Sequence, residues 1–419
     1  MNTLLPVLVV IVLALLGARV SFSTVQSGLG PRLLFRTGAH FVVVGFLLGP
    51  SGLGLLTADA TQQLSPLLAL GLGWVGFHFG LQLDRRALEQ FSPSHQVLAF
   101  GQAAFAFLIF GGVAYLAARL AGLDDPVVML LVLTAASTAS VTTPAGIAIV
   151  SANFRVKGNV RNLLLFIGSI DALIGITALQ VTYALYRPGT VLAGIGAASQ
   201  LVFVGLAVGV GLVCGIFFMW LTRSKPVSEE LVLFLLGICA FGAGVALQWD
   251  LSPLFVSAIM GAVVANLSRE TDRIRLLLSR WEKPVYVTFL LIAGALIEIP
   301  TWMVFPMAVG YAGLRFLAKL VGAGILVGGL PFSFEVPKRL GLGLVPQGGI
   351  SIAMAVSGAL MYSDLQIRGV DAEALLFAVI VIGVALAELT GPFLTTRLLE
   401  RAGEIPGERP VAAESRLDG

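Results

Sequence analysis

The feature that most constrains this chain is its succession of apolar runs, many of them 17 residues or longer. A run of that length forms a helix that crosses the hydrocarbon core of a bilayer, which is about 30 Å thick. Hydrophobic residues make up 57% of the chain and charged residues only 12%, and a water-soluble protein of this size does not bury such a fraction. The sequence therefore predicts an all-α integral membrane protein.

Thirteen transmembrane spans can be drawn between short polar loops. Their predicted ranges are about Leu4–Val20, His40–Leu56, Leu64–Leu83, Gln96–Leu120, Pro126–Val150, Val160–Tyr186, Val191–Leu221, Glu230–Leu247, Pro253–Leu267, Pro284–Ile299, Met303–Val327, Leu340–Met361 and Ala374–Leu399. We expect one transmembrane domain over residues 1–400 and a disordered cytoplasmic tail over residues 401–419. The charged stretch Ser268–Lys283 is predicted to lie along the membrane surface as a separate amphipathic segment.

The positive charges are distributed unevenly over the loops. With the N-terminus outside, 21 of the 26 Lys and Arg residues fall on the inner side, 3 on the outer side and 2 within a span. Short loops rich in Lys and Arg stay in the cytoplasm. The sequence thus predicts a multi-pass protein of the cell (inner) membrane with its N-terminus outside and its C-terminus in the cytoplasm.

The two halves of the chain resemble each other. The corresponding segments are Gly45–Gly49 with Gly261–Ala265, Gly80–Asp84 with Gly294–Glu298, and Thr142–Gly146 with Val345–Gly349. They lie seven spans apart, an odd number, so the two copies would have opposite orientations in the membrane. Inverted repeats of this kind are typical of secondary transporters, whose site lies at mid-membrane where the copies meet.

The fifth and twelfth spans are predicted to be discontinuous helices that cross. Each has a proline closely followed by glycine within an apolar run, and these residues are Pro144, Gly146, Pro346, Gly348 and Gly349. Proline removes a backbone donor, and irregular backbone at membrane depth occurs only where protein or water covers it. A matched pair favours this reading over two proline kinks, and Thr143 is expected to cap the half-helix that starts at Pro144.

Asp171 lies in the middle of the sixth span, FIGSIDALIGI. A carboxylate at that depth costs at least ~2.5 kcal/mol on insertion scales and is functional by default; the alternative is a neutralised acid that only joins helices. We predict that Asp171 binds a proton and a monovalent metal cation in turn. Ser140, Thr142 and Thr143 are the candidate oxygen ligands that accompany it.

Four further side chains are singled out. Arg315 and Lys319 lie on one face of the eleventh span and are expected to offset the negative ends of the half-helices. Gln347 would approach from the twelfth span. His78 is a candidate pH sensor, although a ring hydrogen-bonded in a helix interface is the favoured alternative. Glu388 is expected to be a solvated acid near a helix end.

Four motifs follow one another in a fixed order. They are GFLLGPSGLGLL (Gly45–Leu56), GWVGFHFGLQLD (Gly73–Asp84), RFLAKLVGA (Arg315–Ala323) and VPQGGISIAMA (Val345–Ala355). Together they resemble the monovalent cation:proton antiporter superfamily, in particular its Kef-like branch, without the C-terminal nucleotide-binding domain. The resemblance covers the second to the thirteenth span.

The resemblance implies a sodium/proton antiporter fold, a homodimer and an elevator-type movement. It implies scaffold helices at about 4–83 and 230–299, core helices at about 96–186 and 303–399, and a linker helix at 191–221. Asp171 matches the ion-binding aspartate of the family, Lys319 its core lysine and Thr142 the threonine of its Thr-Asp pair. The chain departs from the family at Ile170 and Thr143, where further polar or acidic residues are usual.

The sequence therefore predicts a secondary transporter, not an enzyme, that exchanges sodium or potassium for protons across the lipid bilayer. No cofactor and no nucleic-acid partner are expected. One titrating carboxylate predicts one-for-one, electroneutral exchange. Two alternatives remain: a sodium-coupled symporter of an organic solute on a similar fold, and a degenerate transporter that acts as a sensor.

Overall fold

The computed structural model describes residues 38–57, 63–123, 126–186, 200–224, 226–268, 270–362 and 365–405. Its helices and strands are α3 (Ala39–Leu48), α5 (Ser65–Leu81), α6 (Arg85–Leu88), α7 (Pro93–Leu120), α8 (Pro126–Ser140), α9 (Pro144–Asn153), α10 (Asn159–Leu185), α12 (Val202–Leu221), η1 (Thr222–Ser224), α13 (Ser228–Gln248), α14 (Pro253–Leu267), α15 (Thr271–Ala295), α16 (Val304–Gly329), η2 (Leu340–Leu344), α17 (Gly348–Met361), β1 (Gln366–Ile367), β2 (Val370–Asp371) and α18 (Ala372–Arg401). Apart from the short antiparallel hairpin β1–β2, these residues are helical or in loops.

Seven helices in the described residues are long and apolar enough to cross a membrane, counting α8 and α9 together. The chain is therefore a multi-pass membrane protein. The first predicted span lies outside the described residues, as do residues 187–199 at the start of the predicted linker helix. Each of the other predicted spans coincides with a helix or with a pair of helices on either side of a break.

Two of the predicted segments have wrong boundaries. The second span ends as a helix at Leu48 rather than Leu56, because Gly49 turns the chain into extended backbone ahead of Pro50. The stretch that ends at Lys283 is no separate surface segment: it is the first half of α15, which continues through Pro284. Its apolar face, with Ile274, Leu277 and Leu278, is buried against the protein rather than turned to lipid.

The start of the predicted disordered tail is ordered. Residues 401–405 are described, and the Glu404 carboxylate accepts hydrogen bonds from the backbone amides of Val160 at 2.7 Å and Arg161 at 2.9 Å. These two amides lie in the first turn of α10 and have no acceptor within the helix, and a negative charge is stabilising at a helix N-terminus. The rest of the tail, 406–419, lies outside the described residues.

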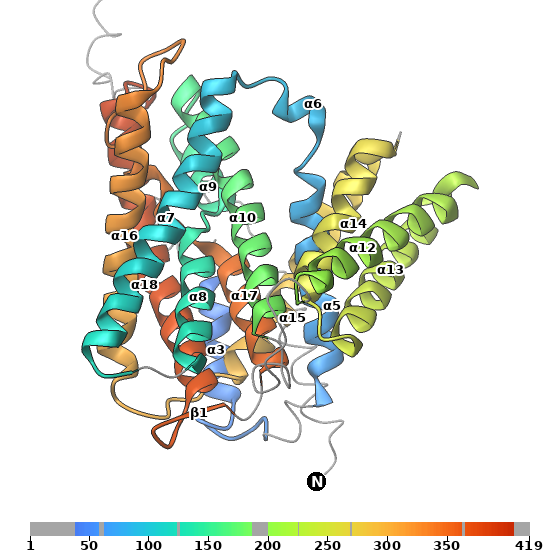
Figure 1. Cartoon of the computed structure of the whole chain (residues 1–419). Coiled ribbons are helices and arrows are strands. Elements are labelled where there is room, and N and C mark those ends of the chain that lie inside the picture. Colours follow the sequence, from blue (N-terminus) through green and yellow to red (C-terminus); the bar gives the residue numbers. More distant parts are fainter. Residues whose placement is uncertain are drawn as a thin grey trace, which may run out of the picture.

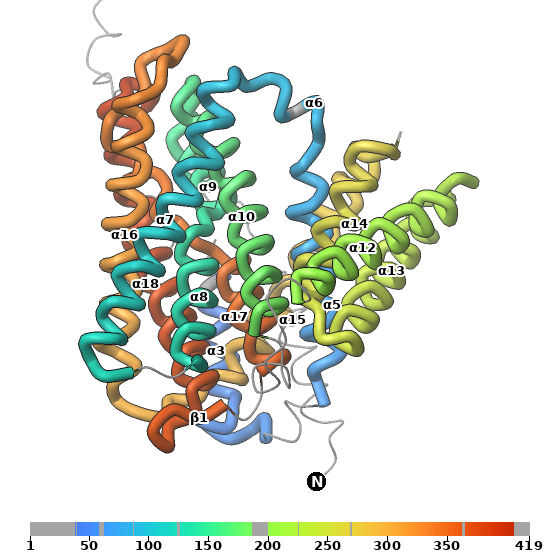
Figure 2. The backbone as a smooth tube through the Cα atoms, in the orientation of Figure 1, coloured from blue at the N-terminus to red at the C-terminus, as the bar shows by residue number. Residues whose placement is uncertain are grey.

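The helices pack in two groups. Most of the first, with α5, α12, α13 and α14, lies on the right of Figure 1, and most of the second, with α7, α9, α16 and α18, on the left; α3 of the first group lies below α8 in this view. The first bundle consists of α3, α5, α12, α13, α14 and α15, in which α5 packs on α14 and α3 on α15. The second bundle consists of α7, α8, α9, α10, α16, η2, α17 and α18. Figure 2 shows the chain passing from α5 through α6 to α7, and so from one bundle to the other.

Glycines bring the helices of the first bundle into backbone contact. Gly45 of α3 faces Gly294 of α15, and Gly80 of α5 faces Gly261 of α14. At each of the four positions an added Cβ would lie within 2.2 Å of a backbone carbonyl oxygen of the facing helix. Small residues at helix interfaces serve this purpose in membranes, where van der Waals packing drives association.

We expect Gly45→Ala to destabilise the protein by ~1–3 kcal/mol, since the added methyl group forces α3 and α15 apart. The midpoint of thermal unfolding in detergent, followed by tryptophan fluorescence, measures the effect. Gly237→Ala in α13 is the control, because a Cβ there meets nothing within 4 Å. Equal midpoints for the two variants would show that the close approach has no weight in stability.

Candidate functional site

Two helices of the second bundle are interrupted at the same place. α8 ends at Ser140 and α9 begins at Pro144, while η2 ends at Leu344 and α17 begins at Gly348. The unwound segments between them, 141–143 and 345–347, are joined where the amide of Thr143 donates to the carbonyl oxygen of Pro346 at 3.0 Å. The structure therefore has the two predicted breaks, and it brings them together.

The first break has the predicted cap. Thr143 is extended and its hydroxyl accepts a hydrogen bond from the amide of Ala145 at 3.4 Å, while Pro144 takes the first helical position. Proline suits that position because the donor it lacks would have no partner there. The local sequence Thr-Pro thus explains why a new half-helix starts at this residue.

The predicted glycines give the crossing its room. An added Cβ at Gly146 would lie 2.6 Å from the ring of Pro346, and one at Gly348 would lie 2.8 Å from Thr143. Gly348 also has a φ of +62°, a left-handed conformation that residues with a side chain rarely adopt. Gly349 lies against the hydroxyl of Tyr286 on α15. Side chains at Gly146 and Gly348 would push the two unwound segments apart, and one at Gly349 would push α17 away from α15.

Arg315 satisfies the carbonyl groups at the ends of both first half-helices. Its guanidinium donates to the carbonyl oxygens of Val345 at 2.7 Å, Val141 at 2.6 Å and Leu344 at 3.4 Å. The side chain is 1% exposed. Since half-helix C-termini carry partial negative charge, the cation lies where the sequence led us to expect one.

Glu388 satisfies the opposite end of the second break. One carboxylate oxygen accepts from the amides of Gln347 at 3.0 Å and Gly348 at 2.7 Å, at the positive N-terminus of α17. The residue is 3% exposed, so the expectation of a solvated acid is wrong. Glu388 lies in the middle of α18, which runs from Ala372 to Arg401, and not near a helix end.

Asp171 and Lys319 form an ion pair with no exposed surface. The Lys319 ammonium donates to Asp171 Oδ2 at 2.7 Å, and both side chains are 0% exposed. The ammonium also donates to the carbonyl oxygen of Ser140 and to Gln102 Oε1, the latter at 3.3 Å. Gln102 Nε2 in turn donates to Asp171 Oδ2 at 2.8 Å. The acid, the ammonium and the amide form one closed cluster.

The cluster lies against the first break because α10 approaches it closely. Gly168 and Gly175 are one turn on either side of Asp171. A Cβ added at Gly168 would lie 3.3 Å from the nitrogen of Pro144, and a Cβ added at Gly175 would lie 2.9 Å from the carbonyl oxygen of Ser137. The hydroxyl of Thr142 lies beside the Asp171 carboxylate and donates to the carbonyl oxygen of Leu344 at 3.0 Å. The structure thus brings Thr142 and the carbonyl oxygen of Ser140 close to the pair of Asp171 and Lys319, whereas the Ser140 hydroxyl donates to the carbonyl oxygen of Ser137 at 2.8 Å.

A cavity of about 380 Å³ reaches the crossing from one end of the molecule. Its walls come from both bundles: α5 and α15 on one side, α9 and α17 with Glu388 on the other. The lining includes Gln82, next to α6, and Thr143 at the break, but not Asp171. One backbone segment therefore separates Asp171 from the cavity, with Thr143 on the cavity side and Thr142 on the acid side.

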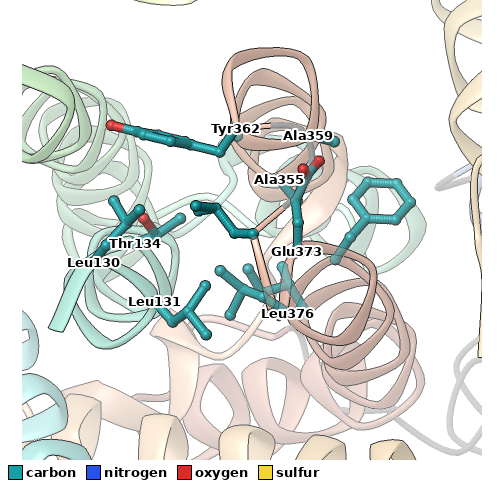
Figure 3. A pocket seen from close by; sticks show the side chains of 12 residues that line it. Leu130, Leu131, Thr134, Ala355, Ala359, Tyr362, Glu373 and Leu376 are labelled. Atoms are coloured by element: carbon teal, nitrogen blue, oxygen red, sulfur yellow. The ribbon is translucent and has the colours of Figure 1, made fainter. Parts of the chain in front are cut away.

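A smaller pocket lies towards the other end of the molecule, next to β1. This pocket, shown in Figure 3 between α8, α17 and α18, has a volume of about 20 Å³. Most of the labelled side chains, such as Leu130, Leu131 and Leu376, are apolar. A further pocket of about 270 Å³, with an apolar lining, lies between α3, α17 and α18 and includes Ile297 and Ile299 just after α15. Of these three pockets, the one at the α6 end reaches the residues of the first break.

One known protein family matches this chain in sequence. The family described as "Sodium/hydrogen exchanger, transmembrane" matches residues 11–401 of the chain. The chain belongs to the sodium/hydrogen exchanger family. No curated protein matches it in sequence.

Two solved structures have a similar fold to this exchanger-family chain. One is the sodium proton antiporter MjNhaP1 from Methanocaldococcus jannaschii at pH 8, with a TM-score of 0.69 and 16% identity over 97% of this chain and 100% of that one. The other is an electron-microscopy structure of the same antiporter, with a TM-score of 0.65 and 18% identity over the same shares of the two chains. At these identities the likeness shows the fold.

Two predicted residues of this exchanger-family chain lie away from the acid. Gln347 donates from its side chain to the carbonyl oxygen of Thr138 at 2.9 Å and to the hydroxyl of Tyr311 at 2.6 Å, and so ties α17 to α8 and α16. His78 lines the cavity, with Nδ1 3.8 Å from a carboxylate oxygen of Glu282. Neither touches Asp171 through a hydrogen bond in the structure.

One site residue was missed from the sequence. Gln102 is 0% exposed and bonds to both charges of the ion pair. The available signal was an amide in the middle of an apolar span, GQAAFAF, since a polar group buried in a membrane needs a partner. Reasoning from ionisable residues alone passes over it.

Replacing Arg315 with methionine leaves the buried carbonyl groups of Val141 and Val345 without this donor, so we expect Arg315→Met to cost ~1–3 kcal/mol of stability for each of the two. Thermal unfolding in detergent measures it. Arg368→Met is the matched control, because that guanidinium also donates to a carbonyl oxygen, of Gly122 at 3.0 Å, but on the surface. An Arg315 variant as stable as the control would contradict the bridging role.

Proposed function

We propose that this protein exchanges a monovalent cation, sodium or potassium, for protons, and that Asp171 is the site both share. The observation that carries the proposal is the fully buried pair of Asp171 and Lys319 at the crossing of two broken helices. Membership of the sodium/hydrogen exchanger family supports the reaction class.

The pair explains how one site serves two passengers in turn. An unpaired carboxylate at this depth is costly, so Asp171 always holds a positive partner: the Lys319 ammonium, a proton or a cation. In the proton-bound state, Asp171 and Lys319 share one proton between them. A cation that binds Asp171 displaces this proton, which leaves the site, so neither state contains a lone buried charge. Asp171 Oδ1 accepts no hydrogen bond from the described residues and is available to the cation.

We assign different roles to the candidate ligands. Thr142 and the carbonyl oxygen of Ser140 lie at the acid and complete the cation site. The Thr143 hydroxyl already caps α9 and its residue lines the cavity, so we place it on the path of the ion. Arg315 and Gln347 hold the broken helices in position around the site.

An inverted repeat is supported by the close contacts. The predicted correspondence matches Gly45 with Gly261 and Gly80 with Gly294, and the structure pairs Gly45 with Gly294 and Gly261 with Gly80. Exchanging the two halves therefore turns one contact into the other. The broken helices repeat the pattern: Gly168 of α10 lies against Pro144, and Gly391 of α18 lies against Pro346.

We further propose an elevator-type movement in a homodimer. The second bundle carries the site and acts as the moving core, and the first bundle acts as the scaffold. The cavity that reaches the first break between the bundles from the α6 end fits one of two alternating states. The excess of Lys and Arg in the loops at that end indicates that it faces the cytoplasm.

We expect Asp171→Asn to abolish exchange, because the neutral amide takes up no proton at cellular pH and offers the cation no negative charge to pair with. Dequenching of a pH-sensitive dye in everted vesicles, after addition of sodium or potassium, measures the activity. Glu89→Gln, at an exposed side chain paired with Arg85, is the control and should match the wild type. Full activity in the Asp171 variant, or exchange that needs an added organic solute, would refute the proposal.

A single titrating carboxylate carries either one proton or one monovalent cation, so we expect electroneutral exchange. Purified protein on a solid-supported membrane should then give no transported charge on sodium or potassium addition, while vesicles of the same preparation show pH changes. A steady cation-evoked charge movement would show that a further charged group takes part.

A further inference from the structure

We propose that Gln102 is a ligand of the transported cation and that it determines which alkali cation the site prefers. This inference rests on the exchange proposed above. It concerns a residue outside the two broken helices and outside α10, and it starts from the contacts of the Gln102 amide.

The packing of α7 holds the Gln102 side chain in the cluster with Asp171 and Lys319. It projects from α7, which packs on both α16 and α10, the helices of Lys319 and Asp171. Gly322 of α16 lets α7 come close, since an added Cβ there would lie 3.1 Å from Phe105 and 3.5 Å from the carbonyl oxygen of Gln102. The residues of α7 around it, Leu98, Ala99, Ala103 and Ala106, are apolar and at most 1% exposed.

The orientation of the amide follows from its neighbours. An ammonium can only donate, and an ionised carboxylate can only accept. The amide therefore presents Oε1 to Lys319 and Nε2 to Asp171, as the distances of 3.3 Å and 2.8 Å show. A side chain with only a donor or only an acceptor would satisfy one of the two charges.

The surroundings of the ammonium are those of a cation site. Its three acceptors are a carboxylate oxygen of Asp171, the backbone carbonyl oxygen of Ser140 and Oε1 of Gln102. They come from α10, the end of α8 and α7, and together they are the carboxylate and carbonyl oxygens that hard cations take as ligands. A cation that pairs with Asp171 in place of Lys319 meets the same three oxygens.

Gln102 is the member of this set that can tune the size of the site. The carbonyl oxygen of Ser140 belongs to the backbone and cannot move by a side-chain rotation. Asp171 is held in place because Gly168 and Gly175 let α10 pack closely against the first break. The amide oxygen, in contrast, is placed by the length of its side chain. Asparagine is one methylene shorter, about 1.5 Å, and withdraws that oxygen, which favours a larger cation over a smaller one.

The test compares lithium, sodium and potassium in the vesicle assay for the wild type, Gln102→Asn and Gln102→Leu. The leucine variant loses one ligand, so we expect its apparent KM for sodium to rise about tenfold, equivalent to ~1.4 kcal/mol. In the asparagine variant we expect the KM ratio of lithium to potassium to rise, because the enlarged site suits the larger ion. A purely structural role would lower the rate without moving that ratio.

Gln96→Asn is the matched control. Gln96 lies on the same helix, and its side chain donates only to the carbonyl oxygens of Leu88 and Phe91. We expect its cation ratio to equal that of the wild type. Binding is checked without transport by comparing the thermal unfolding of purified protein in sodium chloride and in choline chloride. A ligand that binds the folded state stabilises it more, at a given concentration, the more tightly it binds. Sodium should stabilise the leucine variant less than the wild type.

Each outcome decides between the two proposals. If the wild type exchanges alkali cations and Asp171→Asn does not, while the Gln102 variants keep wild-type KM values and cation ratio, the inference on Gln102 alone is overturned. If the leucine variant does not fold, the ratio in Gln102→Asn decides. If the wild type exchanges no alkali cation, the proposed function fails, and the role of Gln102 fails with it.

Discussion

The structure depends on satisfying bare backbone groups in the middle of a membrane. Two helices stop halfway across, and inside a bilayer no water is at hand to bind the carbonyl and amide groups left open. The protein supplies each partner itself. Arg315 bonds the carbonyl ends of both first half-helices, Glu388 bonds the amide end of α17, and Thr143 caps α9 and also bonds to Pro346. The crossing exists because this set of contacts is complete enough to replace water.

In the exchange that we propose, the same set of contacts creates the conditions for ion binding. Four helix ends, an arginine and a glutamate meet within one small region, so the local charge is balanced before Asp171 is considered. Asp171 and Lys319 then add an ion pair whose partners cannot separate without a replacement, because a lone buried charge costs several kcal/mol. A site of this kind releases one positive partner only as it accepts another. That is the physical requirement for coupling two fluxes.

Some features of the site follow from local sequence and others do not. Thr143-Pro144 predicts a capped half-helix from rules that act over three residues, and the structure has it. Glu388 was misread although the predicted span Ala374–Leu399 has it near the middle, because the amides that it accepts from, at the start of α17, are 40 and 41 residues away and no local pattern shows them. The first half of α15 was misread because a charged stretch on the surface and one packed on neighbouring helices have the same pattern. The amino-acid composition of this stretch does not show whether its apolar face contacts lipid or other helices of the protein.

The sequence by itself determined the membrane class, the positions of the two breaks and the presence of Asp171 and Lys319 at mid-depth, because apolar length, proline and buried charge act through neighbours along the chain. Only the tertiary structure decided which groups meet. Lys319 reaches Asp171 across 148 residues, Ser140 across 179 and Gln102 across 217, and Arg315 reaches Val141 across 174. Contacts over such separations depend on helix packing. Glycines such as Gly168 and Gly175 allow this packing, but a single sequence does not indicate which helix each of them will contact.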